Sequence, residues 1–189
     1  MFIIIKIIAG KNRGNILKTK DGITTRPTLN RIRENIFNII RDKVSGAKVL
    51  DVFAGSGAIG IEALSRGASE ATFIELDKEA YRILKENIGK TNNLDKSKII
   101  NGDFRNILKK ITNSYDIIYI DPPYNLNAYE EVLSFIGSND LLAENGIIIL
   151  EAKKDTTLPS ESNDFKCYRN VIYGNTIIKF YNKNWEDEL

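Results

Sequence analysis

The chain has 189 residues, of which 42% are hydrophobic, and a formal net charge of +2, which indicates one globular domain with a small extension. A single cysteine, Cys167, and the absence of histidine exclude an internal disulfide, a cysteine-based zinc site, histidine metal ligands and serine–histidine catalysis. Lys6 interrupts the apolar start, and no apolar stretch approaches the roughly 20 residues of a membrane span, so we expect a cytoplasmic protein with no signal peptide, membrane segment or metal.

The N-terminal segment predicts a basic β-hairpin arm. Residues 2–8 and 15–18 are strand-like and are joined by AGKNRG, and Pro27 stops any strand from running on. Residues 1–33 contain eight Lys or Arg and one acid, a charge of +7 that leaves −5 for the rest of the chain. This asymmetry favours a polyanionic partner, although lysines on a hairpin also deter edge-to-edge pairing. We place the arm at residues 1–25 and the main domain at 26–189.

After Pro27, apolar residues recur at steps of three and four, which predicts a helix to about residue 40, capped by Thr28 or Asn30. From Lys48 onward, strands alternate with helices, which predicts an α/β fold with a parallel sheet and helices on both faces. The expected strands are 48–54, 70–76, 97–102, 115–121 and 146–152, and the expected helices are 58–67, 78–88, a short helix after Asp103, and 128–136.

The C-terminal part breaks this alternation. Two strand-like runs, 165–174 and 176–183, flank the turn sequence YGNT with no helix between them, which predicts an antiparallel hairpin that completes the sheet. We expect residues 153–164, KKDTTLPSESND, to form a flexible loop.

The sequence DVFAGSGAIG, residues 51–60, places G-x-G-x-x-G where the first parallel strand turns into its helix. Glycines there let a ligand approach the backbone near the free N–H groups of the helix N-terminus. The pattern alone does not separate a dinucleotide from another ligand, and tight packing also produces it. Asp51 favours a ligand with an ammonium group, because a carboxylate in the strand that feeds the loop repels a pyrophosphate. S-adenosylmethionine (SAM) has such a group and no phosphate.

Two further acids follow the next strands, at the carboxyl edge of the sheet where this kind of fold binds ligands. Glu75, twenty residues past Gly55, can accept both hydroxyls of a ribose, although Asp77 competes for that role and a solvent-exposed strand end is the alternative. Asp103 can accept a hydrogen bond from the amino group of adenine, with Phe104 beside the ring.

The sequence YIDPPYN places Asp121, Pro122, Pro123 and Tyr124 at the end of the fourth strand. The motif could be a strand-stopping turn. As a site, it suits methyl transfer to an exocyclic base amine. The Asp121 carboxylate and the Pro122 carbonyl can accept the two N–H groups and orient the nitrogen lone pair, in a geometry that the prolines fix beforehand. Tyr124 can stack on a flipped or unpaired base.

These motifs resemble the RsmD-type 16S rRNA (guanine-N2)-methyltransferases. The resemblance rests on RPTLNRIRENIFNII, LDVFAGSGAIGIEALSRGA, FIELD and DPPY in this order, together with the opening IIAGKNRG and the closing YGNTIIKFY. It implies a Rossmann-like SAM-dependent methyltransferase fold with a mostly parallel seven-stranded sheet, an antiparallel C-terminal hairpin and an N-terminal β-hairpin extension. It also implies SAM as the methyl donor and a guanine of 16S rRNA, in the small ribosomal subunit or its assembly intermediate, as the target.

Site residues follow from the same resemblance. Arg33 is implied either as a phosphate contact or as the partner of Glu34 or a strand-end acid in an ion pair. The implied catalytic residues are Asp121, Pro122, Pro123 and Tyr124. The implied cofactor-binding residues are Asp51, Phe53, Ala54, Gly55, Ser56, Gly57, Glu75, Leu76, Asp103 and Phe104. The implied RNA-binding residues are Lys11, Arg13, Arg26, Thr28 and Arg31.

Three alternatives remain open at this point. A DNA adenine-N6 methyltransferase shares D-P-P-Y but usually needs an additional region that reads base edges. A NAD-dependent oxidoreductase shares the glycine motif, but Asp51 and the absence of histidine count against it. A non-catalytic RNA-binding assembly factor on a methyltransferase scaffold is disfavoured by the intact D-P-P-Y.

Overall fold

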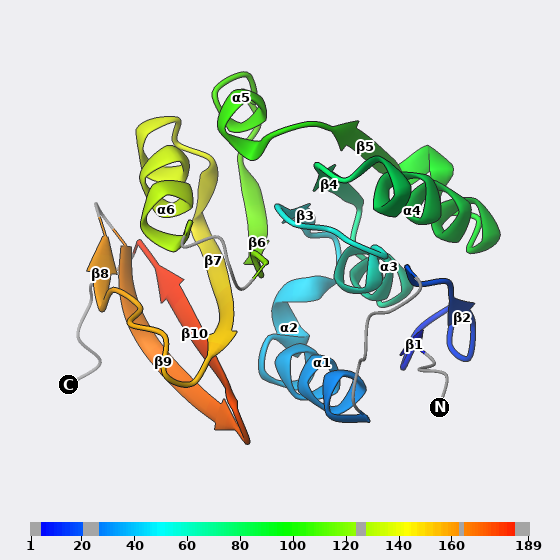
Figure 1. Cartoon of the computed structure of the whole chain (residues 1–189), viewed down its shortest axis with the longest axis horizontal. Helices are drawn as coiled ribbons and strands as arrows, with labels where there is room; N and C mark the ends of the chain where they lie inside the picture. The colour runs from blue at the N-terminus through cyan, green and yellow to red at the C-terminus, as the bar shows by residue number, and fades with distance from the viewer. Residues whose placement is uncertain (1–4, 21–26, 124–127, 163–164, 184–189) are drawn as a thin grey trace.

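The computed structural model describes residues 5–20, 27–123, 128–162 and 165–183, with residues 27–29 described by their backbone alone. These residues form an eight-stranded sheet of order β5-β4-β3-β6-β7-β10-β9-β8 and a separate two-stranded hairpin, β1-β2 (Figure 1). The large sheet comprises β3 Lys48–Asp51, β4 Glu70–Glu75, β5 Ser97–Asn101, β6 Tyr115–Ile120, β7 Leu142–Lys153, β8 Glu161–Ser162, β9 Phe165–Tyr173 and β10 Thr176–Asn182.

The order of the strands creates a switch point between β3 and β6. The chain runs outward from β3 through β4 to β5, then returns to pair β6 with the other side of β3, all in parallel. In open α/β sheets, ligands bind outside the carboxyl ends of the strands at such a point. Asp51 ends β3 and Asp121 follows β6, so two of the predicted site residues meet there.

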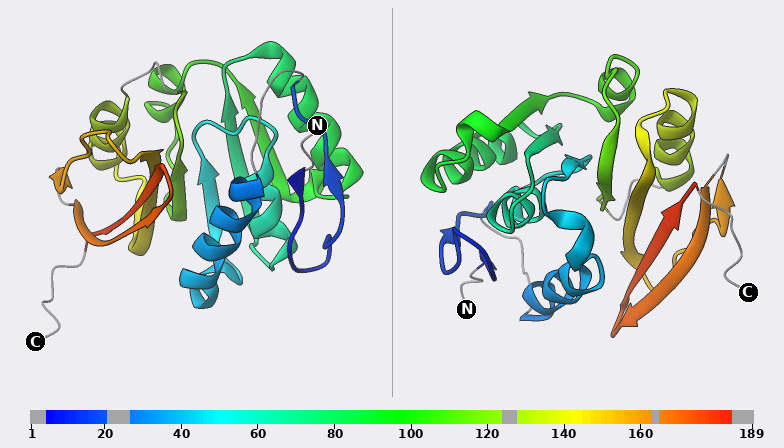
Figure 2. Two further views of the ribbon diagram at one scale, coloured as in Figure 1. Left: turned by 60° about the horizontal axis from the view of Figure 1, so that its bottom comes forward. Right: turned by 180° about the vertical axis from the view of Figure 1, so that it is seen from behind.

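Helices cover both faces of the sheet, as predicted (Figures 1 and 2). One apolar cluster joins the sheet to α1, α2, α3, α4 and the β1-β2 hairpin, and the other joins it to α5 and α6. Strand residues alternate between the clusters, with Val49, Ile117 and Tyr119 in the first and Leu50 and Ile118 in the second. The helices are α1 Pro27–Ile39, α2 Arg41–Val44, α3 Ala58–Ser65, α4 Lys78–Lys90, α5 Phe104–Leu108 and α6 Tyr129–Ser138.

The predicted α/β fold is confirmed, with β8 as an addition to the expected seven strands. It lies in the segment expected to be a loop, and Ser162 and Glu161 pair with Phe165 and Lys166 of β9. Leu158 and Phe165 are buried, which holds this segment against the sheet. Two short elements had no distinct pattern in the sequence: α2 and a turn of 3₁₀ helix at Leu94–Lys96.

Within the described residues, the strands of the hairpin arm cover less of the chain than expected, with β1 at Ile5–Lys6 and β2 at Ile16–Leu17. Ile5, Ile7 and Leu17 are buried in the first apolar cluster. The arm therefore shares a core with the main domain, and the boundary at residue 25 remains a prediction.

Candidate active site

The glycine motif forms the turn from β3 into α3. A Cβ at Gly60 would lie 2.2 Å from Cε1 of Phe73, so this glycine is required for α3 to pack against β4. At Gly55, by contrast, nothing lies within 4 Å of where a Cβ would stand, and Gly55 lines a cavity. The turn thus combines one glycine needed for packing with one that leaves its backbone open to a ligand.

Glu75, at the end of β4, is held by two backbone donors. Its Oε2 accepts from Gly55 N–H at 2.7 Å and its Oε1 from Asp77 N–H at 2.8 Å. Asn101 on β5 donates to the carbonyl oxygens of Glu75 and Leu76, at 2.7 and 3.1 Å. The Leu76 side chain is 63% exposed beside this fixed carboxylate. The arrangement presents an oriented acid and an apolar surface side by side.

Asp103 and Phe104 have structural partners as well. Asp103 caps α5 by accepting from Arg105 N–H at 2.8 Å, and it also pairs with the Arg105 guanidinium. Phe104 is 4% exposed, and its ring packs edge-on against Phe53 at a centroid distance of 5.3 Å. Both residues lie at the predicted sheet edge, and Phe104 packs within the core there.

Three carboxylates converge on one face of the sheet: Asp51 on β3, Asp121 after β6 and Glu151 on β7. We call them the acid cluster. Asp51 is in register with Tyr119, and Ile120 with Leu150, so Asp121 and Glu151 follow as the next pair. The Tyr119 hydroxyl donates a hydrogen bond to Oε2 of Glu151. Sequence reasoning found Asp51 and Asp121 but missed Glu151, although it ends the apolar run IIILE just as Glu75 ends its strand.

Burial and mutual repulsion shift the acid cluster toward its protonated forms. Burial raises the pKa of Asp51 to about 7, against a lowering hydrogen bond from the Gly60 backbone. The pKa of Asp121 lies well above its ordinary value because of burial and of the neighbouring Glu151 and Asp51 charges. Burial also raises the pKa of Glu151, whereas the hydrogen bond from Tyr119 lowers it. A cation placed among these groups would be strongly favoured.

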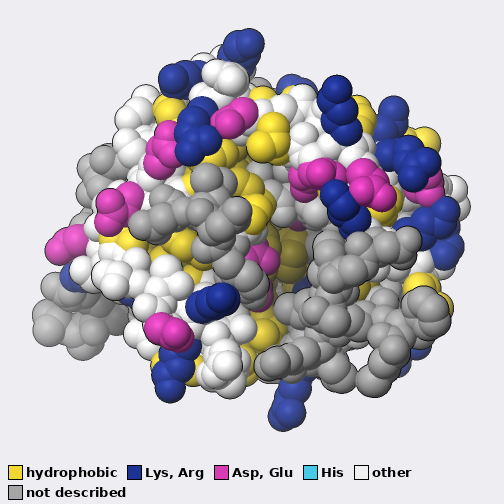
Figure 3. Space-filling view, in the orientation of Figure 1, with side chains coloured by type: hydrophobic (Ala, Val, Ile, Leu, Met, Phe, Trp, Pro, Cys, Tyr) yellow, Lys and Arg dark blue, Asp and Glu magenta, His cyan; other side chains and the backbone are white. Residues whose placement is uncertain are grey.

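A cavity of about 210 Å³ opens over the acid cluster. Figure 3 shows a hollow on this face of the molecule, with acidic and hydrophobic side chains at its floor. Its walls come from the glycine turn, α1, α4 and the arm. The lining residues are Ile5, Thr19, Lys20, Arg33, Asp51, Phe53, Ala54, Gly55, Ser56, Ala58, Ile59, Ala80, Ile83, Tyr119, Asp121 and Glu151.

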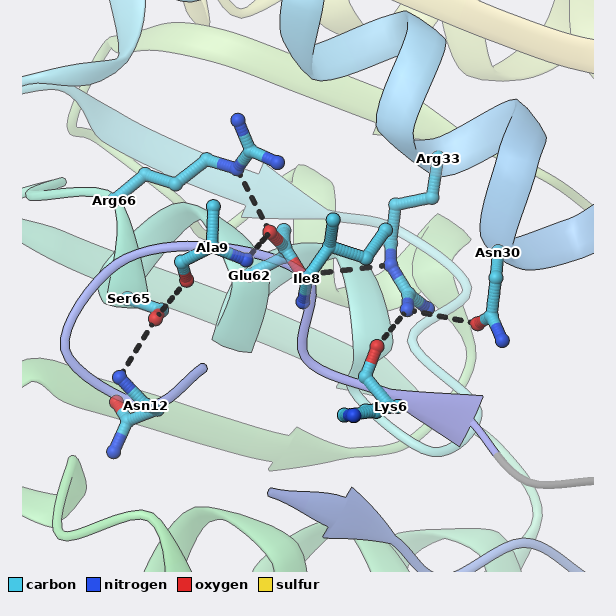
Figure 4. A network of polar contacts seen from close by, with 9 residues as sticks. All are labelled: Lys6, Ile8, Ala9, Asn12, Asn30, Arg33, Glu62, Ser65 and Arg66. Atoms are coloured by element: carbon cyan, nitrogen blue, oxygen red, sulfur yellow. Dashed lines mark hydrogen bonds and ion pairs between the residues drawn. The ribbon is translucent and has the colours of Figure 1, made fainter. Parts of the chain in front are cut away.

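A buried polar network attaches the arm to α3 (Figure 4). Glu62 of α3 is fully buried and accepts from Ile8 N–H at 2.8 Å, Ala9 N–H at 3.0 Å and Arg66 Nε at 2.8 Å. Arg33, 4% exposed, lies 3.6 Å from the same carboxylate and donates to the Lys6 carbonyl. The predicted ion pair of Arg33 therefore exists, but with Glu62 rather than Glu34 or a strand-end acid. Its burial contradicts the phosphate-contact alternative.

A second contact places the arm against the glycine turn. The Asn87 side chain of α4 accepts from Lys18 N–H at 2.8 Å, donates to the Lys18 carbonyl at 3.0 Å and donates to the Ser56 carbonyl at 2.8 Å. Lys20, next along the arm, pairs with Asp77 and Glu79 at 3.0 and 3.2 Å. The arm is thus part of the wall of the cavity.

Two of the predicted RNA-binding residues, Lys11 and Arg13, are separated in space from the acid cluster. Lys11 and Arg13 are exposed in the loop of the arm, where Lys11 N–H donates to the Ser65 carbonyl at the end of α3. Asn12 of the same loop donates to the Thr91 carbonyl, at the end of α4. Because both helices begin at the carboxyl edge of the sheet, this loop lies at the opposite edge (Figure 2). Arg31 is exposed on α1.

Three further predicted residues cannot be placed or only partly so. Arg26 and Tyr124 lie outside the described residues, as does the side chain of Thr28. Pro122 is buried and Pro123 is exposed, and both follow Asp121, which lines the cavity.

Across the described residues, no group of three or more His, Cys, Asp or Glu side chains has the arrangement of a metal site. The helices in that part of the chain are too short or too polar to cross a bilayer.

Comparison with known proteins identifies close relatives. The family model described as Conserved hypothetical protein 95 matches residues 5–182. The chain is 32% identical to Ribosomal RNA small subunit methyltransferase D of Escherichia coli K12, over 97% of this chain and 92% of that protein. Identity to the Haemophilus influenzae protein of the same name is 36%, over 84% of each. The solved structure of Escherichia coli yhhF superposes with a TM-score of 0.86, at 31% identity over 96% of this chain and 99% of that one.

Proposed function

The chain belongs to the family described as Conserved hypothetical protein 95, the RsmD-type methyltransferases, and from that premise we propose that it methylates the exocyclic N2 amine of a guanine in 16S rRNA, with SAM as donor. The observation that carries the proposal is the acid cluster, which opens into a cavity at the switch point of the sheet and includes the aspartate of D-P-P-Y. The relatives' names support small-subunit rRNA as the target, and we propose that the reaction takes place in the cytoplasm.

The described residues fit SAM. Asp51, with its raised pKa, is suited to receive an ammonium group, because a cation favours the ionised carboxylate. Each Glu75 oxygen keeps a second lone pair for a ribose hydroxyl, and Leu76 offers an apolar surface for adenine. We assign Asp103 to the adenine amino group and the turn from Phe53 to Gly57 to the methionine end. When bound, SAM supplies an electrophilic methyl group on a sulfonium.

Asp121 orients the target amine. Its carboxylate has no hydrogen-bond partner among the described residues and lines the cavity, so it is available to accept one amine N–H, while the Pro122 carbonyl accepts the other. The prolines hold both acceptors in place before the base arrives, which reduces reorganisation during the reaction. As the N–C bond forms and the S–C bond breaks, the nitrogen loses a proton. The raised pKa of Asp121 suits its carboxylate to receive that proton.

Two rival functions make different products. A DNA adenine-N6 methyltransferase would use the same Asp121–Pro122 acceptors on a different base, and an assembly factor would bind RNA without transferring a methyl group. The names of the relatives refer to ribosomal RNA, which favours an RNA target.

Product analysis tests the proposal. The protein is incubated with radiolabelled SAM and, in parallel, small ribosomal subunits, naked 16S rRNA, tRNA and duplex DNA, followed by mass spectrometry of the nucleosides. We expect N2-methylguanosine from the small subunit or its rRNA. N6-methyladenosine as the product, or label in DNA alone, would instead support a DNA adenine-N6 methyltransferase. RNA binding without any methylated product would support a non-catalytic assembly factor. Calorimetric preference for NAD over SAM would contradict the cofactor assignment.

A further inference from the structure

Glu151 is a cavity residue with one carboxylate oxygen unused. The side chain is 8% exposed, lines the cavity and receives the Tyr119 hydroxyl at Oε2. Tyr129 reaches the same residue but donates to its backbone carbonyl, at 3.1 Å. Within the described part of the chain, Oε1 has no hydrogen-bond partner. A buried carboxylate held by one oxygen and open at the other is built to receive a donor.

The position of Glu151 in the sheet indicates which part of the substrate can donate a hydrogen bond to Oε1. Glu151 follows Leu150, and Asp121 follows Ile120. Leu150 and Ile120 are register partners on adjacent parallel strands. Such strands lie about 4.8 Å apart, so the two carboxylates stand side by side on one face. A base whose amine is held by Asp121 therefore has one of the two ring atoms beside that amine within reach of Glu151.

The ring atom beside the amine differs among bases. In guanine, the N2 amine lies between N1–H, which is a donor, and N3, which is an acceptor. In adenine, the N6 amine lies between N1, which is an acceptor, and C5, so no ring donor adjoins it. We propose that Glu151 is a specificity-determining residue, whose Oε1 accepts guanine N1–H and repels the N1 lone pair of adenine. This inference rests on the proposed function and adds to it the group that selects the base.

The charges around Glu151 keep it an acceptor. The Tyr119 hydroxyl donates to Glu151, and a hydrogen bond to a carboxylate favours the ionised form. Asp121 has no such donor among the described residues, and the charge of Glu151 itself raises the Asp121 pKa. The titratable and charged groups on the surrounding elements are Asp51 on β3, Tyr119 on β6 and Arg33 on α1.

The test uses a base that keeps the exocyclic amine of guanine but has a hydrogen-bond acceptor instead of a donor at N1. 2-Aminopurine has the same exocyclic amine as guanine, with an acceptor at N1 in place of N1–H and a hydrogen in place of O6. The contribution of Glu151 is therefore read from the change in base preference between wild type and Glu151→Gln. Once the methylated guanine has been mapped, rRNA fragments are joined by splint ligation to carry guanine or 2-aminopurine there, and kcat/KM is measured on both. We expect wild type to prefer guanine by about 10- to 100-fold, the range of one good base contact.

Glu151→Gln should reduce that preference at least about tenfold, because Tyr119 holds the amide oxygen and turns the NH₂ toward N1. Glu151→Asp keeps the carboxylate and should keep the preference at a lower rate. Glu144→Gln, an exposed change on the same strand, is the matched control and should leave both rates unchanged. Calorimetry with SAM and thermal melting check that each variant is folded.

An unchanged guanine preference in Glu151→Gln would overturn the inference, as would an equal loss of rate on both RNAs in a folded variant. A wild-type enzyme that does not distinguish the two bases would also overturn it. Failure of wild type to methylate either RNA would instead overturn the proposed function on which the inference rests.

Discussion

At the scale of single residues, the site concentrates negative charge where a cation is expected. Asp51, Asp121 and Glu151 are all shifted toward protonation, and burial is the largest cause in each case. Such groups are costly for an empty site and useful for a filled one, because a bound cation offsets their repulsion. The predictions for Asp51 and Asp121 follow from this.

SAM binding should depend on pH through Asp51. Because the Asp51 pKa is about 7 without ligand, binding an ammonium group below that pH requires release of a proton. SAM affinity measured by calorimetry should fall up to about tenfold for each pH unit below about 7 and level off above it. Asp51→Asn should bind weakly and lose this slope. A pH-independent wild-type affinity between pH 5.5 and 8 would contradict the assignment.

The raised pKa of Asp51 also predicts the direction in which the stability of the ligand-free protein changes with pH. A carboxyl whose folded-state pKa is raised contributes stability below its ordinary pKa, and that contribution is lost as pH rises through the folded value. Urea unfolding of the ligand-free proteins should therefore show Asp51→Asn gaining on wild type as pH rises from about 4 toward about 8, which reads the Asp51 pKa without any cofactor.

Asp121→Ala should abolish methyl transfer while SAM binding survives. Loss of a preorganised acceptor at the reacting nitrogen costs about 100-fold or more in kcat. The change removes a carboxylate repelled by Glu151 and Asp51, so the variant should melt no lower than wild type. Single-turnover rates with labelled SAM measure the first effect and calorimetry the second. Activity within a few fold of wild type would remove Asp121 from the reaction.

At the scale of elements, the arm depends on a close approach to the end of α3. Gly10 has φ of +78°, and a Cβ there would lie 1.7 Å from the Ser65 carbonyl oxygen. Lys11 N–H donates to that same carbonyl. The clash is with backbone, so no side-chain rotation relieves it, and the arm would have to detach from the helix.

Gly10→Ala should lower the free energy of unfolding by at least about 2 kcal/mol. The matched control is Gly174→Ala, which also has a positive φ, +58°, but nothing within 4 Å of the added Cβ. That change should cost only about 1 kcal/mol, the price of the left-handed conformation. Urea denaturation compares them, and equal losses would show that the contact with Ser65 carries no stability.

The elements of the domain were largely predictable, and those of the arm were not. Alternating apolar runs and glycine turns identified every parallel strand, because burial on both faces leaves a strong pattern. Within the described residues, the arm's strands are shorter than predicted, because the contacts that fix the arm are side-chain carboxylates and amides far along the chain, such as Glu62 and Asn87. No local pattern reports a partner more than fifty residues away. The two-residue strand β8 likewise forms only through its pairing with β9.

At the scale of the whole molecule, the candidate site was half visible in the sequence. Asp51, Glu75 and Asp121 stand in motifs, so their chemistry could be inferred before their positions. Glu151 has no motif and was missed, because its role depends on β7 lying beside β6. Arg33 was expected either to contact phosphate or to pair with Glu34 or a strand-end acid, but it pairs with the fully buried Glu62.

Binding of rRNA should be steeply salt-dependent and should weaken when the arm loses charge. Lys11 and Arg13 are exposed at its loop. If each contacts a phosphate, Lys11→Gln with Arg13→Gln should reduce the slope of log K against log salt by about 1.4 to 2. Lys110→Gln, an exposed change beyond α5 on the other face of the sheet, is the control. A slope equal to that of wild type would remove the loop from the interface.

The loop of the arm is fixed at the ends of α3 and α4 that lie away from the acid cluster, so its distance from the cavity is set by the fold. The eight residues of α3 rise on the order of 12 Å, so a polynucleotide that touches the loop and also delivers a base to the pocket must wrap around one flank of the molecule. A short single-stranded oligomer has no fixed shape with which to meet both points at once. A protein that contacts RNA at two points a fixed distance apart would therefore prefer a folded region of RNA to the same sequence in an isolated strand.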